Sequence, residues 1–210
     1  MASDTLDIRS SDRDSNKLEI FLAVALGIAA IGTAYAAYRS SLLNDDMISN
    51  YQLGIRNVNE SSQATDEANI QFAQDQAVFL EFFTAAEIDN APAVASFINT
   101  ELMSQPLSDA VAVWAETDMK TPFEDDSVYF LDGWRRGDEL KEEADRRFAM
   151  AAEADEESDR YELVTVITAA VLFFLGMGAI VNAGPAKRGF IGAGTILLGV
   201  SIVMLVILTV

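Results

Sequence analysis

Three long stretches without a charged side chain constrain this chain more than any other feature: residues 20–38, 163–186 and 189–210. Each is about twenty residues long, and a helix of that length, rising roughly 1.5 Å per residue, matches the ~30 Å hydrocarbon core of a bilayer. Because backbone polar groups cannot stay unpaired in lipid, each stretch must be helical. The sequence therefore predicts an all-α fold: an integral membrane protein with three transmembrane helices and a long helical-hairpin extramembrane domain.

Two alternatives for these stretches are weaker. Helices in the core of a water-soluble protein would need a polar face, and residues 189–210 have none. A cleaved signal peptide would explain the A-x-A-like site in "GTAYAAY". However, residues 1–18 carry four acidic side chains beside three basic ones, and the apolar run is long for a signal. We expect the first stretch to remain in the protein as a transmembrane helix.

Nearly all of the formal net charge of −19 lies between the first two stretches. Residues 39–160 hold 27 acidic and 9 basic side chains, so this segment repels nucleic acid and anionic headgroups, and no nucleic-acid partner is expected. The chain has no cysteine and no histidine, which excludes disulfides, thiolate or imidazole catalysis, haem ligation and ordinary zinc sites. We accordingly expect no cofactor and no enzymatic activity. The acidity, with ten arginines against four lysines, is typical of a salt-adapted organism.

The basic residues predict the orientation. Short loops rich in Lys and Arg stay in the cytoplasm, whereas long segments cross the membrane largely regardless of charge. The segment "VNAGPAKRGF" between the last two stretches carries two basic residues and no acid, and three basic residues precede the first stretch. In the cell membrane we therefore predict a cytoplasmic N-terminal tail (1–18), transmembrane helix 1 (19–38), an acidic helical extracytoplasmic domain (39–160), transmembrane helix 2 (161–183), a cytoplasmic turn (184–189) and transmembrane helix 3 (190–210).

The first transmembrane helix is expected to continue into the extracytoplasmic domain. Gly54 is the only glycine between Gly32 and Gly133, and no proline precedes Pro92. Asparagines and serines at residues 57–62 favour an interruption of this helix near residue 60. A 3-4 alternation of apolar residues predicts its buried face: Ile48, Tyr51, Ile55, Val58, Phe72, Phe79 and Phe83.

Two short helices are predicted next, at about residues 92–103 and 107–117, with Asn90 as a cap for the first. Residues 117–134 contain Pro122 and many polar side chains, and are expected to form a loop. A second long helix is expected from Asp138 into the second transmembrane stretch. The apolar side chains expected to pack against the aromatic end of the first helix are Phe97, Ile98, Leu102, Leu107, Val111, Val113 and Trp114, with Phe123, Tyr129, Phe130 and Trp134 holding the loop.

One acidic run is a candidate metal site. Glu124, Asp125 and Asp126 are hard oxygen ligands suited to Ca²⁺, but they lack the alternating spacing and the closing Glu of a calcium loop. A solvated acidic loop is the competing interpretation. Without histidine there is no Glu-x-x-His pair, so a di-iron bundle is excluded. Carboxylates on the second long helix leave hydrolysis conceivable, although nothing in their spacing distinguishes them from a charged helix face.

Small residues predict where the transmembrane helices pack, because close backbone approach holds helices together in lipid. The candidate packing residues are a stripe at four-residue spacing on the first helix, Ala25, Ala29, Thr33 and Ala37, together with Gly176 on the second. Packing within one protomer and packing between protomers both fit this pattern. At the outer end of the first two helices, Arg39 and Glu162 are expected to form an interfacial charge pair. No charge lies at mid-depth, which disfavours a pump.

The chain resembles a family of small three-span membrane proteins of bacteria and archaea, a domain of unknown function. The resemblance covers nearly the whole chain and depends on four segments: "YRSSLLNDDMISNYQ", "AVFLEFFTAAEIDNAPAVASFI", "AVAVWAETDMKTPFEDDSVYF" and "AAEADEESDRYELVTVITAAVLFFLGMGAI". It implies the three-span topology and supplies no reaction.

Three functions are considered for this chain. The first is a non-enzymatic membrane protein, an oligomeric scaffold or accessory subunit whose acidic external domain binds a partner; beyond membrane lipid, the expected partner is a second copy or another membrane protein. The second is a cation channel or transporter-like oligomer, in which Thr33, Thr165 and Thr168 line a path below an acidic mouth. The third is an envelope hydrolase that uses carboxylates. The first is the function we expect.

Overall fold

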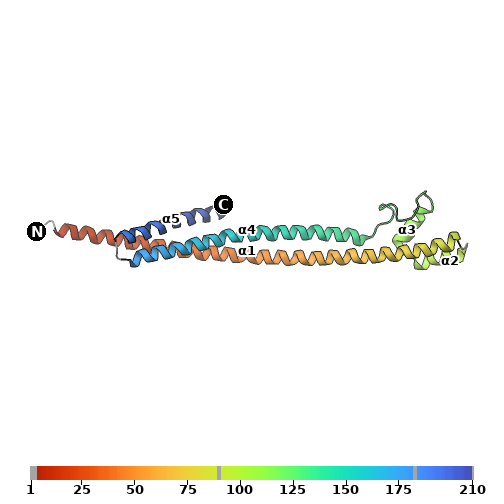
Figure 1. Cartoon of the computed structure of the whole chain (residues 1–210), viewed down its shortest axis with the longest axis horizontal. Helices are drawn as coiled ribbons and strands as arrows, with labels where there is room; N and C mark the ends of the chain where they lie inside the picture. Colours follow the sequence, from red (N-terminus) through yellow and green to blue (C-terminus); the bar gives the residue numbers. More distant parts are fainter. Residues whose placement is uncertain (1–3, 89–90, 182–183, 210) are drawn as a thin grey trace. The chain divides into compact units, whose positions relative to one another are not determined.

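The computed structural model describes residues 4–88, 91–181 and 184–209. Within these ranges the fold is all-α, with five α-helices and no strand (Figure 1). The chain divides into two compact units, Met1–Asn50 with Ala149–Val210 (the apolar unit) and Tyr51–Phe148 (the acidic unit). The helices are α1 (Asp4–Phe83), α2 (Pro92–Phe97), α3 (Gln105–Trp114), α4 (Asp132–Ile180) and α5 (Gly184–Thr209), with π-helical turns at Thr84–Ile88 and Ile98–Leu102.

The long helix α1 has no interruption near residue 60, so that prediction is wrong. Two of the polar residues that suggested a break, Asn57 and Ser61, lie on the side of α1 that meets α4. Asn57 is buried with 9% of its surface exposed, and the Ser61 hydroxyl donates a 2.7 Å hydrogen bond to the carbonyl of Gly137 on α4. Polar side chains that pair across to a second helix do not compete with the backbone of their own helix.

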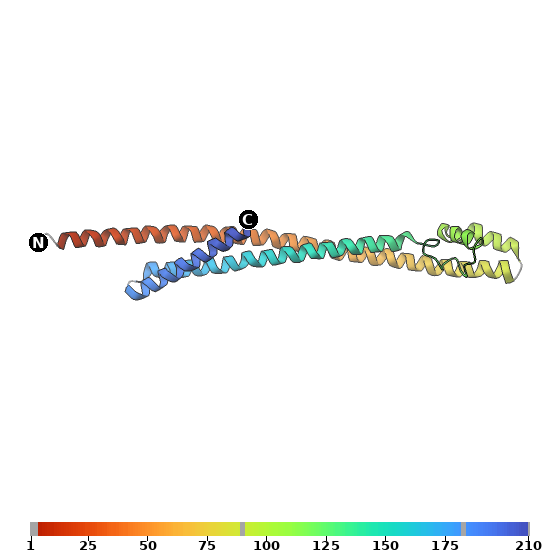
Figure 2. The same ribbon diagram turned by 90° about the horizontal axis from the view of Figure 1, so that it is seen from above.

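In the acidic unit, α1 and α4 run side by side in opposite directions (Figures 1 and 2). The side of α1 that meets α4 follows a 3-4 spacing of small or polar residues: Gly54, Asn57, Ser61, Ala64 and Ala68. A Cβ added to Gly133 would lie 2.8 Å from the carbonyl oxygen of Ala64, and one added to Gly137 would collide with the Thr65 hydroxyl. Small side chains on both helices therefore let the two backbones approach closely.

The apolar stripe expected to be buried on α1 lies one position further along the helix, about 100° around it from the residues that meet α4. Ile48, Tyr51, Ile55 and Val58 are each 41–52% exposed, so this part of the prediction is wrong. The aromatic residues of the same pattern are covered: Phe72 and Phe79 pack against the core, and Phe83 contacts Trp114.

That core lies where α3 and residues 115–131 cover the end of α1. Leu107, Ala110 and Val111 of α3 are buried there together with Tyr129 and Leu131. Aromatic rings pack edge to face around them, with centroids 5.5 Å apart for Phe72 and Phe123 and 5.3 Å for Phe79 and Trp114. Of the apolar residues expected in this core, Phe97, Leu102, Val113 and Phe130 are 42–57% exposed.

The boundaries of two other predicted elements differ from the structure. The second long helix begins at Asp132, six residues before the expected Asp138, because Gly133 fits against α1 and does not break the helix. Residues 184–189, expected as a cytoplasmic turn, form the first turns of α5, in which Pro185 lacks only an amide that a helix start leaves unpaired. The predicted cap Asn90 lies outside the described residues, as do residues 182–183 before α5.

Three helices, α1, α4 and α5, are long and apolar enough to cross a membrane. In the apolar unit they pack through two clusters of buried side chains. One joins Leu22, Ala25 and Ala29 of α1 to Val171 and Leu175 of α4 and Leu198 of α5, and the other surrounds Tyr161. Large apolar side chains on the outer faces stay exposed, for example Ile31 at 73% and Ile196 at 70%. By length and composition, the chain is a possible membrane protein.

Candidate functional site

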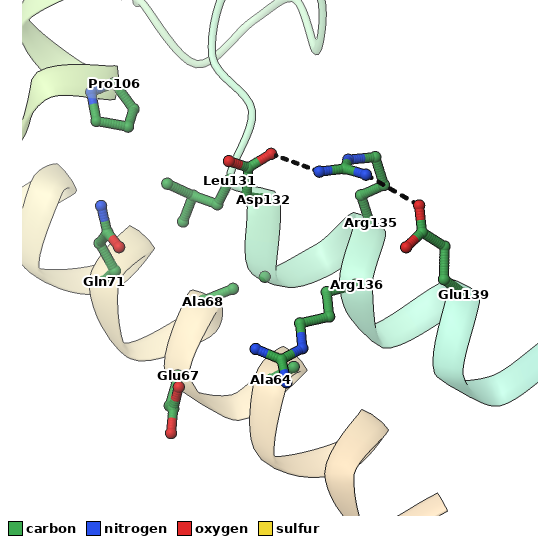
Figure 3. Close-up of a pocket in the computed structure, with 11 residues that line it drawn as sticks. Ala64, Glu67, Ala68, Gln71, Pro106, Leu131, Asp132, Arg135, Arg136 and Glu139 are labelled. Carbon is green, nitrogen blue, oxygen red and sulfur yellow. Dashed lines mark hydrogen bonds and ion pairs between the residues drawn. The ribbon is translucent and has the colours of Figure 1, made fainter. Parts of the chain in front are cut away.

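The acidic unit has a groove built from two adjoining hollows of about 610 and 620 Å³, which share Glu67 and Gln71 of α1. In the first hollow, drawn in Figure 3, the start of α4 faces α1, and Ala64, Ala68 and Gly133 are among the residues that line it. The second continues along α1 toward Asp75 and is closed by Leu102, Met103 and Ser104. We call the two hollows together the groove.

Two arginines of α4 line the first hollow, together with the carboxylates of Glu67, Asp132 and Glu139. Arg135 is held by Asp132 and Glu139, with N···O distances of 3.1 and 2.9 Å, and these bonds raise the pKa of its guanidinium. Arg136 is exposed and, among the described residues, makes no ion pair. In Figure 3 its side chain extends toward α1 over Ala64. One cationic group in the groove is therefore available to a ligand.

A buried carboxylate lines the second hollow. Asp75 is 3% exposed, and its Oδ2 accepts hydrogen bonds of 2.7 Å from both the Tyr129 hydroxyl and the Ser104 hydroxyl. Ser104 is also the N-cap of α3 and accepts a bond from the Leu107 amide. Burial, reinforced by the bond to Asp75, raises the pKa of Tyr129, so this hydroxyl stays protonated as a donor. The sequence reasoning missed Asp75.

The groove combines hydrogen bonds that hold the fold with exposed apolar and charged side chains. The Ser104 hydroxyl both donates to Asp75 and caps a helix, and Tyr129 shares the same carboxylate oxygen, so these groups hold the fold together. The exposed apolar side chains of Ile70 and Leu102 lie at the second hollow and Arg136 at the first, so the groove offers apolar contact and one cationic group without an ion pair.

The acidic run at residues 124–126 is held by its own backbone. Asp125 Oδ1 accepts bonds from the amide and the hydroxyl of Ser127, which lower the pKa of Asp125, and Glu124 Oε2 accepts a 2.8 Å bond from the Lys120 amide. No bond is described for the carboxylate of Asp126. Across the described residues no three acidic side chains come together as a metal site.

The predicted packing stripe on α1 is only partly at an interface. Ala25 and Ala29 are 3% and 1% exposed, but Ala37 is exposed and Ala36 is fully buried in its place. A four-residue spacing advances 400°, so the stripe turns 40° at each step and leaves the contact after three steps. Thr33 is half-buried, and its hydroxyl bonds to the Ala29 carbonyl at 2.8 Å.

Close packing between α4 and α5 occurs at glycines other than Gly176. A Cβ added to Gly176 would meet nothing within 4 Å, whereas one added to Gly178 would lie 2.7 Å from Ile191. One added to Gly194 would lie 2.6 Å from the Leu175 side chain and 3.2 Å from its backbone nitrogen. Small residues correctly indicated close packing of the helices, but not every small residue lies at a helix contact.

The described ion pair of Arg39 is with Glu157, at 3.7 Å, and not with Glu162. Its guanidinium also lies over the Tyr161 ring, 5.5 Å from the centroid. Glu157 lies one helical turn before Tyr161 on α4, the side that meets α1, whereas Glu162 is rotated by about 100°. Glu162 lines a shallow hollow beside Ser40 and Ser41.

A hydroxyl pair lies next to this charge pair. The Ser40 and Ser158 hydroxyls are 3.0 Å apart and buried, and they join α1 to α4. Deeper in the apolar unit, Thr165 and Thr168 bond to carbonyls one turn earlier on α4. Within one protomer these threonine hydroxyls are therefore satisfied by their own helix.

Comparison with protein-family models, with curated proteins and with solved structures found no match for this chain. The resemblance to the three-span family accordingly stays a prediction.

Proposed function

We propose that this chain is a non-enzymatic integral membrane protein, an oligomeric scaffold or accessory subunit whose acidic unit binds a partner protein. The observation that carries the proposal is the groove, which combines the free guanidinium of Arg136 with the exposed apolar side chains of Ile70 and Leu102. The hydroxyls of Ser104 and Tyr129 donate to the buried carboxylate of Asp75 and so stabilise the fold. Mixed apolar and charged surfaces of this kind are typical of protein interfaces.

The proposed orientation places the N-terminus in the cytoplasm and residues 39–160 outside the cell. It is supported by the basic residues near the start of α1 and of α5. Because the chain has no cysteine, Thr100→Cys labelled by a membrane-impermeant maleimide on intact cells tests it. Labelling is expected before lysis, with Arg188→Cys labelled only after lysis; the reverse would contradict the orientation.

Partner binding is tested with a photo-crosslinking amino acid placed on α1 in native membranes. Position 74 lines the groove, and position 76 is also exposed but lies outside it. We expect a discrete adduct with a second protein from position 74 only, and we expect Arg136→Glu to remove it. Equal adducts from both positions, or none from either, would count against the groove as a partner site.

Oligomerisation is supported by the exposed stripe of Tyr51, Ile55 and Val58 on α1. On one side of the stripe Gly54 and Ser61 contact α4, whereas Gln52 and Asn59 on the other side are exposed and uncharged, so a second copy in the same membrane can pack on that side. We expect Ile55→Cys to form a disulfide between two copies and Gln63→Cys, on another face of α1, not to do so. A monomer at both positions would exclude this association.

No described contact favours the channel alternative, since Thr33, Thr165 and Thr168 each donate to a carbonyl of their own helix. Cation flux into liposomes that contain the full chain would support the channel and contradict the scaffold.

A further inference from the structure

A crevice of about 230 Å³ opens on the apolar unit where α1, α4 and α5 come together. Leu18, Leu22 and Leu26 line it from α1, and Ala179 lines it from the end of α4. Leu22 belongs to the buried cluster, and Leu18 and Leu26 pack against that cluster, so the apolar wall is a fixed part of the helix packing.

Two side chains of opposite charge line the same crevice, Glu19 of α1 and Lys187 of α5. Among the described residues neither makes an ion pair or a hydrogen bond, with each other or with any other group. Lys187 is half-buried, whereas its neighbour Arg188 is exposed and does not line the crevice. Lys187, which can bind an anion, and Glu19, which can bind a cation, thus lie beside one apolar surface, and neither has a partner among the described residues.

We propose that this crevice binds one phospholipid whose headgroup carries both a phosphate and a primary amine. The phosphate lies against the Lys187 ammonium, the amine lies against the Glu19 carboxylate, and an acyl chain follows the wall of Leu18, Leu22 and Leu26. Basic pockets between transmembrane helices bind anionic lipid headgroups, and this crevice adds a carboxylate that a headgroup amine can neutralise. A purely anionic headgroup would satisfy Lys187 but would meet repulsion from Glu19.

This inference requires only that the three apolar helices lie in a membrane. It shares that requirement with the proposed function but does not depend on the groove, on the proposed partner or on the orientation of the chain, so it can fail or succeed independently of partner binding.

The test is native mass spectrometry of the full chain in mild detergent with phosphatidylethanolamine, phosphatidylglycerol or soluble phosphoethanolamine. We expect one bound phosphatidylethanolamine, weaker phosphatidylglycerol and no phosphoethanolamine, because the soluble headgroup lacks the acyl chain. Lys187→Ala should weaken the lipid adduct about fivefold, the size expected for one lysine–headgroup contact, while Arg188→Ala should leave it unchanged. Glu19→Gln should abolish the preference for the amine-containing lipid.

A steric variant separates the crevice from surface charge. Ala23 lines the crevice and is exposed, so Ala23→Phe fills the space without entering the buried cluster. We expect it to lose the lipid adduct while its helical circular dichroism and its thermal unfolding without lipid match the parent chain. Equal losses from Lys187→Ala and Arg188→Ala, or a retained adduct in Ala23→Phe, would overturn the proposal.

Discussion

The hydroxyl of Tyr129 lies 2.7 Å from Oδ2 of Asp75, and this bond joins two residues 54 positions apart in the sequence. It ties the segment before α4 to α1, beneath the aromatic side chains that cover the end of the long helix. Ser104 donates to the same carboxylate oxygen from the start of α3. One buried acid therefore fixes three parts of the acidic unit to one another.

Replacing this hydroxyl should destabilise the acidic unit. Tyr129→Phe removes a hydrogen bond to a buried carboxylate, which costs about 1.5–3 kcal/mol in the free energy of unfolding. Trp114 and Trp134 are the only tryptophans and both lie in this unit, so tryptophan fluorescence during denaturant unfolding reports on it directly. The matched control is Tyr51→Phe, because no hydrogen bond is described for the hydroxyl of Tyr51; it should change stability by less than about 0.5 kcal/mol. Equal effects of the two variants would refute the role given to Asp75.

Alkaline pH should weaken the same unit through Tyr129. Because the pKa of Tyr129 is raised in the fold, the unfolded chain releases this proton first, near the ordinary tyrosine value of about 10. The stabilisation is complete below that pH and decreases as the pH rises through the interval up to the folded pKa. The free energy of unfolding of the parent chain should therefore fall more steeply above about pH 10 than that of Tyr129→Phe. Parallel pH profiles would contradict the shift.

Two glycines of α5 should respond in opposite ways to the same substitution. Gly194→Ala places a methyl group 2.6 Å from Leu175, a fully buried residue, and overpacking of this kind costs about 1–3 kcal/mol. Gly192→Ala meets nothing within 4 Å and should be neutral, or stabilising by up to about 1 kcal/mol through helix propensity. Thermal unfolding in detergent, followed by circular dichroism, ranks the two variants. A Gly194→Ala chain as stable as Gly192→Ala would contradict the described α4–α5 contact.

The acidic loop should depend on Asp125 and not on its neighbour. Asp125→Ala removes both bonds to Ser127 and should expose residues 117–131 to limited proteolysis, whereas Asp126→Ala should not. The pKa of Asp125 is lowered in the fold, so its contribution is present above the ordinary carboxyl pKa and is lost as the pH falls. Cleavage of the parent loop by an acid-active protease should accordingly rise at low pH. Identical cleavage of the two variants would show that the bonds to Ser127 do not hold the loop.

The three long apolar helices could be predicted because composition alone specifies them. An uncharged run of about twenty residues has few alternatives to a membrane-length helix. The face by which α1 meets α4 could not be predicted in the same way. Ranking side chains by hydrophobicity favoured Ile55, whereas the contact uses Gly54, because close approach of two helices requires small side chains. Gly133 and Gly137, one turn apart on the same face of α4, indicated this close approach.

The candidate groove was harder to predict, because its members come from α1, the residues before α3 and the start of α4. Asp75 carried a weak signal: it continues the 3-4 spacing of Ala64 and Ala68 as a lone acid on the side of α1 that is buried. Its partners Ser104 and Tyr129 lie in segments whose positions depend on tertiary packing. The partner of Arg39 likewise depended on how α4 is rotated about its axis. Glu157 lies on the side of α4 that meets α1, whereas Glu162 is rotated away from that side.

The hydroxyl of Tyr161 donates a 3.1 Å hydrogen bond to the carbonyl of Leu208, in the last turn of α5. Carbonyls in a final helical turn have no partner within their own helix, and lipid offers none. If α5 slid along α4 by one residue, this bond would be broken and the carbonyl would be left without its partner. A single phenol on α4 thereby fixes the register of α5 against it.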